Sequence, residues 1–401
     1  MAAAPVPSEI VDDLSRRALA AGRASGLDAL GVTTAEAFTA TRHDLEERRA
    51  AGLHGGMQFT YRNPARSTDP RALLPSAQAL VAAARSYSGP DSEGAPADRP
   101  QGRVARYSWS DHYDALRQGL RAVADVLVAD GWRALVVADE NHLVDRAVAH
   151  RAGLGWYGKS SLLLIPGAGS WFVLGSVVTD APLPPTAPEP VPDGCGSCSR
   201  CLPACPTGAI VAPGVVDARR CLAWIVQAPG PMPRRLREPM GDRVYGCDDC
   251  QDACPPNRVE LRRQGSRPGN DDPSGATESV QAGGPWVDLL DLLAADDATL
   301  LARHGRWYIA GRDPRWLRRN ALVALGNVAD PGDPRVAGVL RRFLTGPDDL
   351  LGAHAAWALR RLGRDDLLAG AEHLGPDVRF ELAQPPPTPR VALRPGSPGA
   401  M

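Results

Sequence analysis

Short apolar runs separated by amphipathic stretches dominate the first 180 residues. Three of these runs, Ala79 to Ala84, Ala134 to Ala138 and Trp171 to Thr179, have the length and composition of buried strands. Two other stretches, Ile10 to Ala21 and His112 to Ala129, space their apolar residues at helical intervals. The pattern predicts an α/β or α+β domain.

Between residues 286 and 372 the apolar pattern is helical and repeats. Residues 318–326 (RRNALVALG) are echoed by 352–360 (GAHAAWALR), with Ala-Leu pairs at 324–325 and 358–359. Small residues on helices at such a period are typical of stacked helical hairpins, as in HEAT-type repeats. A plain helical bundle is the alternative, because two copies are a small sample.

Proline and small polar residues mark the boundaries between segments. Residues 181–193 are rich in proline and indicate an extended connector, whereas 384–401 combine proline with few apolar residues. The predicted divisions are a first domain at 1–180, a second at 181–261, a linker at 262–285, a helical domain at 286–372 and a disordered Pro-rich tail at 373–401.

All eight cysteines lie in one stretch, and their spacing is that of iron–sulfur ligands. The run from Cys195 to Pro206 reads C-x2-C-x2-C-x3-C-P, as in bacterial two-cluster ferredoxins. The run from Cys247 to Pro255 is the tail of the same signature, and Cys221 is the simplest choice for its displaced first member. Eight thiolates make two sets of four with none left over, so the chain is expected to carry single electrons.

Short x2 turns bring three cysteines around one cluster, while the fourth cysteine of each run serves the other cluster. The predicted sets are Cys195, Cys198, Cys201 and Cys254 for the first cluster, and Cys221, Cys247, Cys250 and Cys205 for the second. Zinc sites are the alternative, because C-x2-C pairs also bind zinc. Disulfides are disfavoured by the x2 spacing and by the size of the chain.

Composition places the chain among ordinary globular proteins. Its 401 residues are 44% hydrophobic and 23% charged, with a net charge of −1. The first residues lack the basic start and apolar core of a signal peptide, and no apolar run reaches membrane-spanning length. Reduced cysteines and the missing export signal favour the cytoplasm.

Charge is nevertheless uneven along the helical segment. Between Leu301 and Thr345 arginine outnumbers aspartate, a local excess that could bind phosphates. The arginines are at 303, 306, 312, 315, 318, 319, 335, 341 and 342. A solvated helical surface explains the same excess equally well.

Lysine occurs once in the chain, as Lys159 in the glycine-rich stretch Gly153-Leu-Gly-Trp-Tyr-Gly-Lys159-Ser-Ser161. Arginine is otherwise used throughout. Lysine is a compact point donor and arginine a wide fork, so a tight site at Lys159 explains the exception. Chance survival of one lysine is the alternative.

Several motifs together resemble the epoxyqueuosine reductase family, and the resemblance covers about residues 10–365. The stretches that carry it are His54-Gly-Gly-Met57 with Arg62, Arg106-Tyr107, Ala152 to Lys159, Gly169 to Gly175, the first cysteine run, Val216 to Cys221, and Tyr245 to Gln251. The combination of a Gly-Leu-Gly-Trp-x-Gly-Lys loop with two ferredoxin runs downstream makes it specific.

This resemblance implies a cobalamin-binding catalytic domain at 1–180, a ferredoxin-like domain with two [4Fe–4S] clusters at 181–261, and HEAT-like repeats. It implies reduction of epoxyqueuosine to queuosine at the wobble position of tRNA, with electrons passing through the clusters to cobalamin. The implied partners are a tRNA with a GUN anticodon carrying epoxyqueuosine and an external low-potential electron donor. A monomer in the cytoplasm is expected.

The family's proton donor maps onto Asp139, directly after the apolar run Ala134 to Ala138. At a strand end the side chain can face a pocket, where desolvation raises a carboxyl pKa and keeps a proton available. Asp145 is the rival for this role, and a loop or helix-capping aspartate is the structural alternative. The implied cofactor-binding residues are Arg62, Asp139, Lys159, Ser160, Ser161 and Asp248.

Two other functions fit part of the pattern. A reductive dehalogenase-like enzyme would share cobalamin and two clusters, but such enzymes usually have an export signal and lack the helical C-terminal part. An electron-carrier subunit without its own substrate is the third reading, and the domain ahead of the cysteines argues against it.

Overall fold

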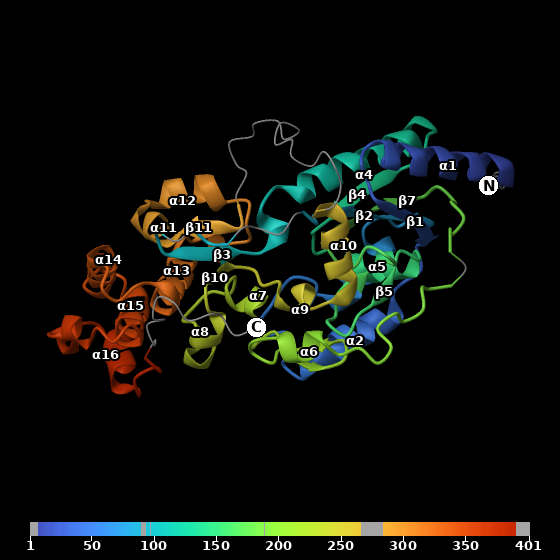
Figure 1. Cartoon of the computed structure of the whole chain (residues 1–401). Coiled ribbons are helices and arrows are strands. Elements are labelled where there is room, and N and C mark those ends of the chain that lie inside the picture. The colour runs from blue at the N-terminus through green and yellow to red at the C-terminus, as the bar shows by residue number, and fades with distance from the viewer. Residues whose placement is uncertain (1–6, 90–93, 97, 188, 266–283, 390–401) are drawn as a thin grey trace. The chain divides into compact units, whose positions relative to one another are not determined.

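A computed structural model describes residues 7–89, 94–96, 98–187, 189–265 and 284–389. The chain forms two compact units that do not follow chain order (Figure 1). Unit 1 comprises the described residues of Met1–Asp91, Ser110–Cys221 and Asp248–Ser279. Unit 2 comprises those of Ser92–Trp109, Leu222–Cys247 and Val280–Met401. The predicted linker at 262–285 lies largely outside the described residues.

Unit 1 is built on a four-stranded sheet in the order β1-β2-β7-β4, and every neighbouring pair is antiparallel. Its strands are β1 (Ala29–Thr34), β2 (Ala79–Ser86), β4 (Ala134–Ala138) and β7 (Phe172–Thr179). The three apolar runs predicted as strands are therefore confirmed. Their antiparallel pairing makes the unit α+β.

Helices cover both faces of this sheet. On one face lies α4 (His112–Ala129), with α1 (Ser8–Ala24) packed beside it. On the other face lies α5 (Asp145–Arg151), whose residues share a core with Leu80 and Val178. The helices predicted from apolar spacing are confirmed, because α1 and α4 contain both stretches.

The cysteine runs form short elements of unit 1. These are α6 (Cys201–Ala204), α9 (Asp249–Asp252), α10 (Pro255–Gly265), and the hairpin of β8 (Ile210–Ala212) and β9 (Val215–Val216). The remaining elements of the unit are α2 (Thr39–Ala50), α3 (Pro64–Ser67), β5 (Trp156–Tyr157) and β6 (Leu163–Leu164). Helices α6 and α9 lie side by side, so the two cysteine runs approach each other.

Unit 2 joins a small sheet to a set of packed helices. The sheet order is β10-β3-β11, from β10 (Arg243–Tyr245), β3 (Gln101–Val104) and β11 (Trp286–Asp288). The helices are α7 (Leu222–Ile225), α8 (Arg234–Met240), α11 (Leu289–Ala294), α12 (Asp297–His304), α13 (Arg315–Val328), α14 (Pro334–Leu344), α15 (Asp349–Arg361) and α16 (Pro376–Ala383). The echoed Ala-Leu pairs lie on α13 and α15, fully buried, and Gly326 contacts Ala358 directly.

Helix α16 corrects the prediction that 373–401 form a disordered tail. It begins with Pro376 in its first turn, which suits a helix start, and it buries Val378 and Glu381. The prediction overlooked these two side chains because proline and exposed polar residues surround them. Residues 390–401 lie outside the described residues.

The arginine-rich segment is also corrected in part. Arg319 is 1% exposed, and its guanidinium donates to the backbone carbonyls of Ala228, Gly230 and Ile225. It fixes the loop after α7 and has no free face for a phosphate. No helix in the described part of the chain is long and apolar enough to cross a membrane.

Candidate active site

Asp139 lies directly after β4, at the position expected from the sequence. Its φ is +56°, in the left-handed region that aspartate tolerates better than most residues. Its backbone N–H donates to the carboxylate of Asp145, the first residue of α5. The strand end and the start of the next helix thus hold Asp139 in an unusual backbone conformation.

The surroundings of Asp139 favour its protonated form. Desolvation by neighbouring protein raises the pKa of its carboxyl, Arg117 opposes this, and Glu140 adds to it. The side chain still reaches solvent. A carboxylic acid with a raised pKa and an open side can deliver a proton to a ligand.

A second carboxyl and a phenol lie beside Asp139. Burial raises the pKa of Asp145 well above its ordinary value, and the charge of Asp139 raises it further. Burial also raises the pKa of Tyr113, with Asp139 and Asp145 adding to the effect. Within the described residues, Oδ1 of Asp145 is buried without a hydrogen-bond partner. Desolvation therefore raises the pKa of all three groups, and Asp139 influences both of its neighbours.

The glycine-rich loop is fastened to α5. Arg146 donates to the carbonyl oxygen of Ser161 at 2.5 Å, and Ser161, with φ +67°, donates its N–H to Gly158 O at 2.9 Å. The hydroxyls of Ser160 and Ser161 have no hydrogen-bond partner in the described part of the chain. Because Arg146 follows Asp145, the loop is held by the same helix end that adjoins the backbone of Asp139.

The other predicted cofactor residues lie elsewhere in unit 1. Lys159 points to the first cysteine run, where its Nζ lies 2.6 Å from Gly196 O. Arg62 is exposed, and its side chain has no partner among the residues that the structure describes. Asp248 begins α9 and lies close enough to Cys250 to raise its pKa. Of the predicted cofactor residues, Ser161 is bonded to α5 through its carbonyl oxygen, and Asp139 lies close to the first residue of that helix.

The cysteines are free thiols and fall into two neighbourhoods. Burial raises the pKa of Cys254 to about 11, and Cys195, Cys201 and Cys198 add to that effect. Burial also raises the pKa of Cys250, and Cys221, Asp248, Cys205 and Cys201 raise it further. Cys201, predicted for the first cluster, therefore lies near thiols of both neighbourhoods, and the division of ligands between the clusters stays a prediction. Cys247 is the last residue of its unit 2 segment, directly before Asp248.

The described ranges contain no group of three or more His, Cys, Asp or Glu side chains that could hold a metal ion.

Hydrogen bonds lower the pKa of the Cys205 thiol and outweigh the effect of burial, which raises it. These bonds come from the Thr207 hydroxyl and from backbone N–H groups. The N–H of Ala209 contributes one of these bonds, at 3.1 Å from Sγ. Such donors stabilise a thiolate, the form that binds iron.

A buried amide pair anchors the second cysteine run. Asn257 accepts the N–H of Ser170 at 2.6 Å and donates to Gln251 O at 2.9 Å, while Gln251 donates to Ser170 O at 3.1 Å. A Cβ on Gly169 would stand 2.0 Å from the Asn257 side-chain oxygen, so only glycine fits there. Sequence reasoning missed Asn257 as a positioning residue, although Gly169-Ser-Trp was among the motifs that it used.

Unit 2 offers a separate polar cavity of about 500 Å³, which contains Arg315, Arg318 and Arg342. Asp297, Asp313 and Asp348 line the same cavity. Arg318 pairs with Asp297 at 2.5 Å and Arg315 with Asp313 at 3.2 Å. The positive charges are therefore balanced locally, and the cavity has no excess that would select a phosphate.

Comparison with known protein families gives two matches. A model described as "4Fe-4S double cluster binding domain" matches residues 194–257, which contain all eight cysteines. A model described as "Epoxyqueuosine reductase QueG, DUF1730" matches residues 67–139, and this match ends at Asp139. The protein is therefore an iron–sulfur oxidoreductase.

Curated relatives extend this match over most of the chain. An epoxyqueuosine reductase from Vibrio cholerae is 36% identical over 317 residues, 77% of this chain and 81% of the relative. One from Xanthomonas campestris pv. campestris is 34% identical over 362 residues, 88% of this chain and 97% of the relative. The chain belongs to the epoxyqueuosine reductase family.

Solved structures are similar over the same extent. One is an epoxyqueuosine reductase with an epoxyqueuosine-modified tRNA-Tyr stem loop (TM-score 0.80, 29% identity, 93% of this chain and 97% of that one). Another is epoxyqueuosine reductase from Bacillus subtilis with its catalytic aspartate loop swung out of the active site (TM-score 0.79, 29% identity, 93% and 97%).

Proposed function

We propose that this protein reduces epoxyqueuosine to queuosine at the wobble position of tRNA, with Asp139 as the proton donor. The observation that carries the proposal is the raised pKa of Asp139 at the end of β4, beside a loop with free hydroxyls. Family membership and the relative with a modified tRNA stem loop support the substrate.

Reduction of an epoxide to an alkene takes two electrons and two protons and releases one water. The clusters deliver the electrons singly, because each cubane changes its charge by one. Asp139 gives its proton to the epoxide oxygen as the carbon–oxygen bond breaks, which makes that oxygen a better leaving group. The raised pKa values of Asp145 and Tyr113 disfavour negative charge next to Asp139.

Cobalamin is the proposed partner of the clusters, and the residues present fit it. Within the described residues, the side chains of Arg62, Ser160 and Ser161 offer unpaired donors, and Asp145, beside Asp139, has a buried Oδ1 without a hydrogen-bond partner. When bound, cobalamin supplies a cobalt centre that accepts electrons and passes them to the epoxide carbon. Asp248 completes the proposed contacts, whereas Lys159, also predicted as a cofactor contact, bonds to the first cysteine run.

The ligand sets of the clusters follow the crossed pattern of the sequence. Cys195, Cys198, Cys201 and Cys254 hold the first cluster, and Cys221, Cys247, Cys250 and Cys205 hold the second. The influence of Cys195, Cys198 and Cys201 on the pKa of Cys254 supports the first set. The neighbouring helices α6 and α9 support a ferredoxin-like arrangement of residues 181–261.

The helical segment is proposed to be HEAT-like and to contact tRNA. Helix α15 packs against both α13 and α14, which supports a HEAT-like arrangement of helices. Arg303 and Arg341 remain exposed and without side-chain partners in the described residues, so they are the arginines of the segment that suit phosphates. A monomer that receives electrons from an external low-potential donor in the cytoplasm completes the proposal.

The test is a single-turnover assay with anaerobic, cluster-loaded protein, cobalamin, dithionite and tRNA that carries epoxyqueuosine. Mass spectrometry of the nucleosides should show queuosine, and Asp139→Asn with equal iron and cobalamin content should not form it. An untouched epoxide with the unaltered protein contradicts the proposal. Turnover of an aryl halide without tRNA binding would instead favour the dehalogenase-like alternative.

A further inference from the structure

The single lysine of the chain ends at the first cysteine run. Its Nζ lies 2.6 Å from the carbonyl oxygen of Gly196, the residue after Cys195. Gly196 has φ +48°, and a Cβ there would meet nothing within 4 Å, so the turn is open on that side. Cys198 donates its N–H to Cys195 O at 2.9 Å within the same turn. The ammonium thus caps the loop that carries two predicted ligands of the first cluster.

The backbone of Lys159 is also fixed. Its carbonyl oxygen accepts the N–H of Gly214 at 3.0 Å, and Arg48 donates to Gly214 O at 3.3 Å. Two segments that are distant in the chain therefore hold the base of the lysine side chain. A side chain anchored at both ends gives a charge with a defined position, unlike a freely moving surface lysine.

The charge lies close to the thiols of that run. The ammonium is hydrogen-bonded to Gly196, which stands between the predicted ligands Cys195 and Cys198. A positive charge at this position favours any negative charge on the group that these cysteines hold. A thiolate-ligated cubane gains one negative charge when it accepts an electron, and its potential depends on nearby charge and hydrogen bonds.

We propose that Lys159 is a positioning and redox-tuning residue of the first cluster, whose ammonium holds the Cys195–Cys198 turn and stabilises the one-electron-reduced cluster. The inference rests on the ligand set proposed above and does not depend on the substrate. It also assigns the amine of Lys159 to the cluster and not to cobalamin.

The experiment is an anaerobic redox titration of the reconstituted full-length protein with dithionite, followed by EPR, without tRNA. In Lys159→Met the equilibrium constant for reduction of one cluster should fall about tenfold, a shift of ~59 mV to lower potential for a one-electron couple. The other cluster should keep its potential. Lys159→Gln keeps a donor for Gly196 O and loses the charge, so it should show the same shift with full iron content.

Two further variants test whether the potential depends on a positive charge at position 159 or on any positive charge near the cysteine run. Lys159→Arg restores a positive charge and should recover most of the potential. Arg200→Gln removes an exposed charge between Cys198 and Cys201, where solvent screens it, and should change the equilibrium constant by less than about threefold.

Unchanged potentials of both clusters in Lys159→Met and Lys159→Gln, at full iron content, overturn the proposal. Loss of cobalamin from these variants with unchanged cluster potentials also overturns it, and returns Lys159 to the cofactor contacts. If Lys159→Met loads iron poorly, Lys159→Gln decides between the two outcomes. Because no step of this test uses the epoxide, its failure and the failure of the proposed function are distinguishable.

Discussion

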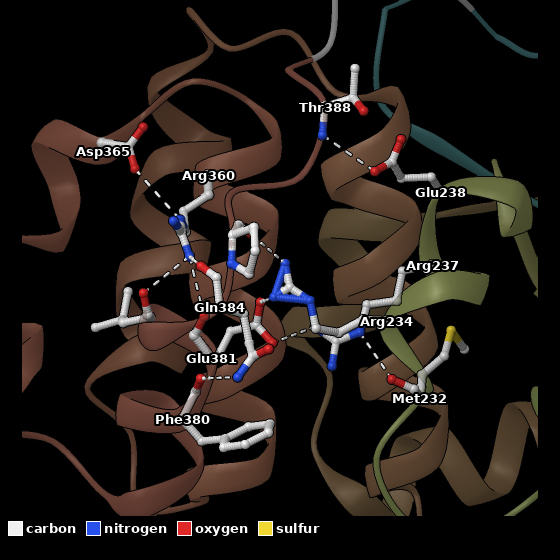
Figure 2. Close-up of polar contacts among 12 residues, drawn as sticks. Met232, Arg234, Arg237, Glu238, Arg360, Asp365, Phe380, Glu381, Gln384 and Thr388 are labelled. Atoms are coloured by element: carbon white, nitrogen blue, oxygen red, sulfur yellow. Dashed lines mark hydrogen bonds and ion pairs between the residues drawn. The ribbon is translucent and has the colours of Figure 1, made fainter.

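Each unit contains acidic side chains whose pKa is raised by burial, but the two units give these carboxyls different partners. In unit 2, Glu381 is 2% exposed and its carboxylate accepts from Arg234 at 2.8 Å and from Arg237 at 3.0 Å (Figure 2). In unit 1, Oδ1 of Asp145 has no partner within the described ranges, and Asp139 has a left-handed backbone. Burial raises the pKa of all three carboxyls.

The surroundings of Glu381 show what a structural acid requires. Its two arginines oppose the effect of burial on its pKa, and the chain around it is held in turn. Arg360 donates to Gln384 O at 2.9 Å and Arg234 to Pro385 O at 2.7 Å, so Figure 2 shows α16 and the following residues tied to their neighbours. These arginines therefore fix the backbone that follows α16.

The acids of unit 1 receive no such compensation. Asp139 and Asp145 have one nearby arginine each in their electrostatic surroundings, Arg117 and Arg146, and neither arginine overcomes burial. Uncompensated acids and strained backbone cost stability, and they persist where chemistry needs them. Burial raises the pKa of the carboxyls in both units. Pairing with arginine, more than burial, therefore distinguishes a structural carboxyl from one that is available to react.

The strongest test of this contrast is Asp139→Asn. Asparagine tolerates a positive φ, so the fold should remain, while the rate of epoxide reduction should fall about 10²–10⁴-fold. Single-turnover formation of queuosine measures the rate, with iron, cobalamin and the melting curve as controls. Full activity in this variant would move the proton donor to another group, with Asp145 first.

Glu381→Gln should act on stability instead. It leaves Arg237, only 4% exposed, without its anion and should cost about 3 kcal/mol of the free energy of unfolding. Urea unfolding followed by tryptophan fluorescence measures this, because Trp316 and Trp357 lie in the core of unit 2. The protein that remains folded should reduce epoxide at the unaltered rate. A lower rate of epoxide reduction without a loss of stability would contradict the assignment of Glu381 as a structural carboxyl.

The pH dependence of epoxide reduction tests the role of Asp139 as the proton donor. Its raised pKa means that the protonated acid persists to higher pH, and activity should fall as pH rises through that pKa. Arg117→Gln removes the charge that lowers this pKa, so the fall should move to higher pH. Glu140→Gln removes the charge that raises it, so the fall should move to lower pH. Rate profiles of the two variants that shift in the same direction would contradict the assignment.

The smallest effect is expected at Glu238, which provides the matched control for Glu381. This carboxylate is 37% exposed and lies 3.4 Å from Arg361. Glu238→Gln should change the free energy of unfolding by about 0–1 kcal/mol, because solvent competes for both charges. A cost as large as that of Glu381→Gln would mean that pairing at the surface matters as much as pairing inside.

The strands of unit 1 could be predicted because β2, β4 and β7 are continuous apolar runs. Their order could not, since an apolar run does not say which neighbour it pairs with. The place of Asp139 at a strand end is confirmed, whereas its role stays a prediction. Its partner Asp145 could only be named as a rival, because a hydrogen bond from the Asp139 backbone depends on a turn that no local pattern specifies.

Side-chain destinations were the least predictable part. Arg319 lies in a run of arginines that resembles a surface, yet four backbone carbonyls of the α7 region draw it inside. Glu381 lies near prolines that indicate disorder, yet two arginines from α8 bury it. In both cases the deciding partners are more than 80 residues away, beyond the reach of composition or periodicity.

The neighbourhood of Cys254 has a consequence for how the protein is made. The pKa of this cysteine is influenced by Cys195, Cys198 and Cys201, which the ribosome produces more than 50 residues earlier, and Cys205 precedes Cys250 by 45 residues. With the proposed ligand sets, a nascent chain that stops short of the second run has neither cluster's ligands complete. Iron insertion is then a late event in biogenesis, in which both centres become possible within a few residues of each other.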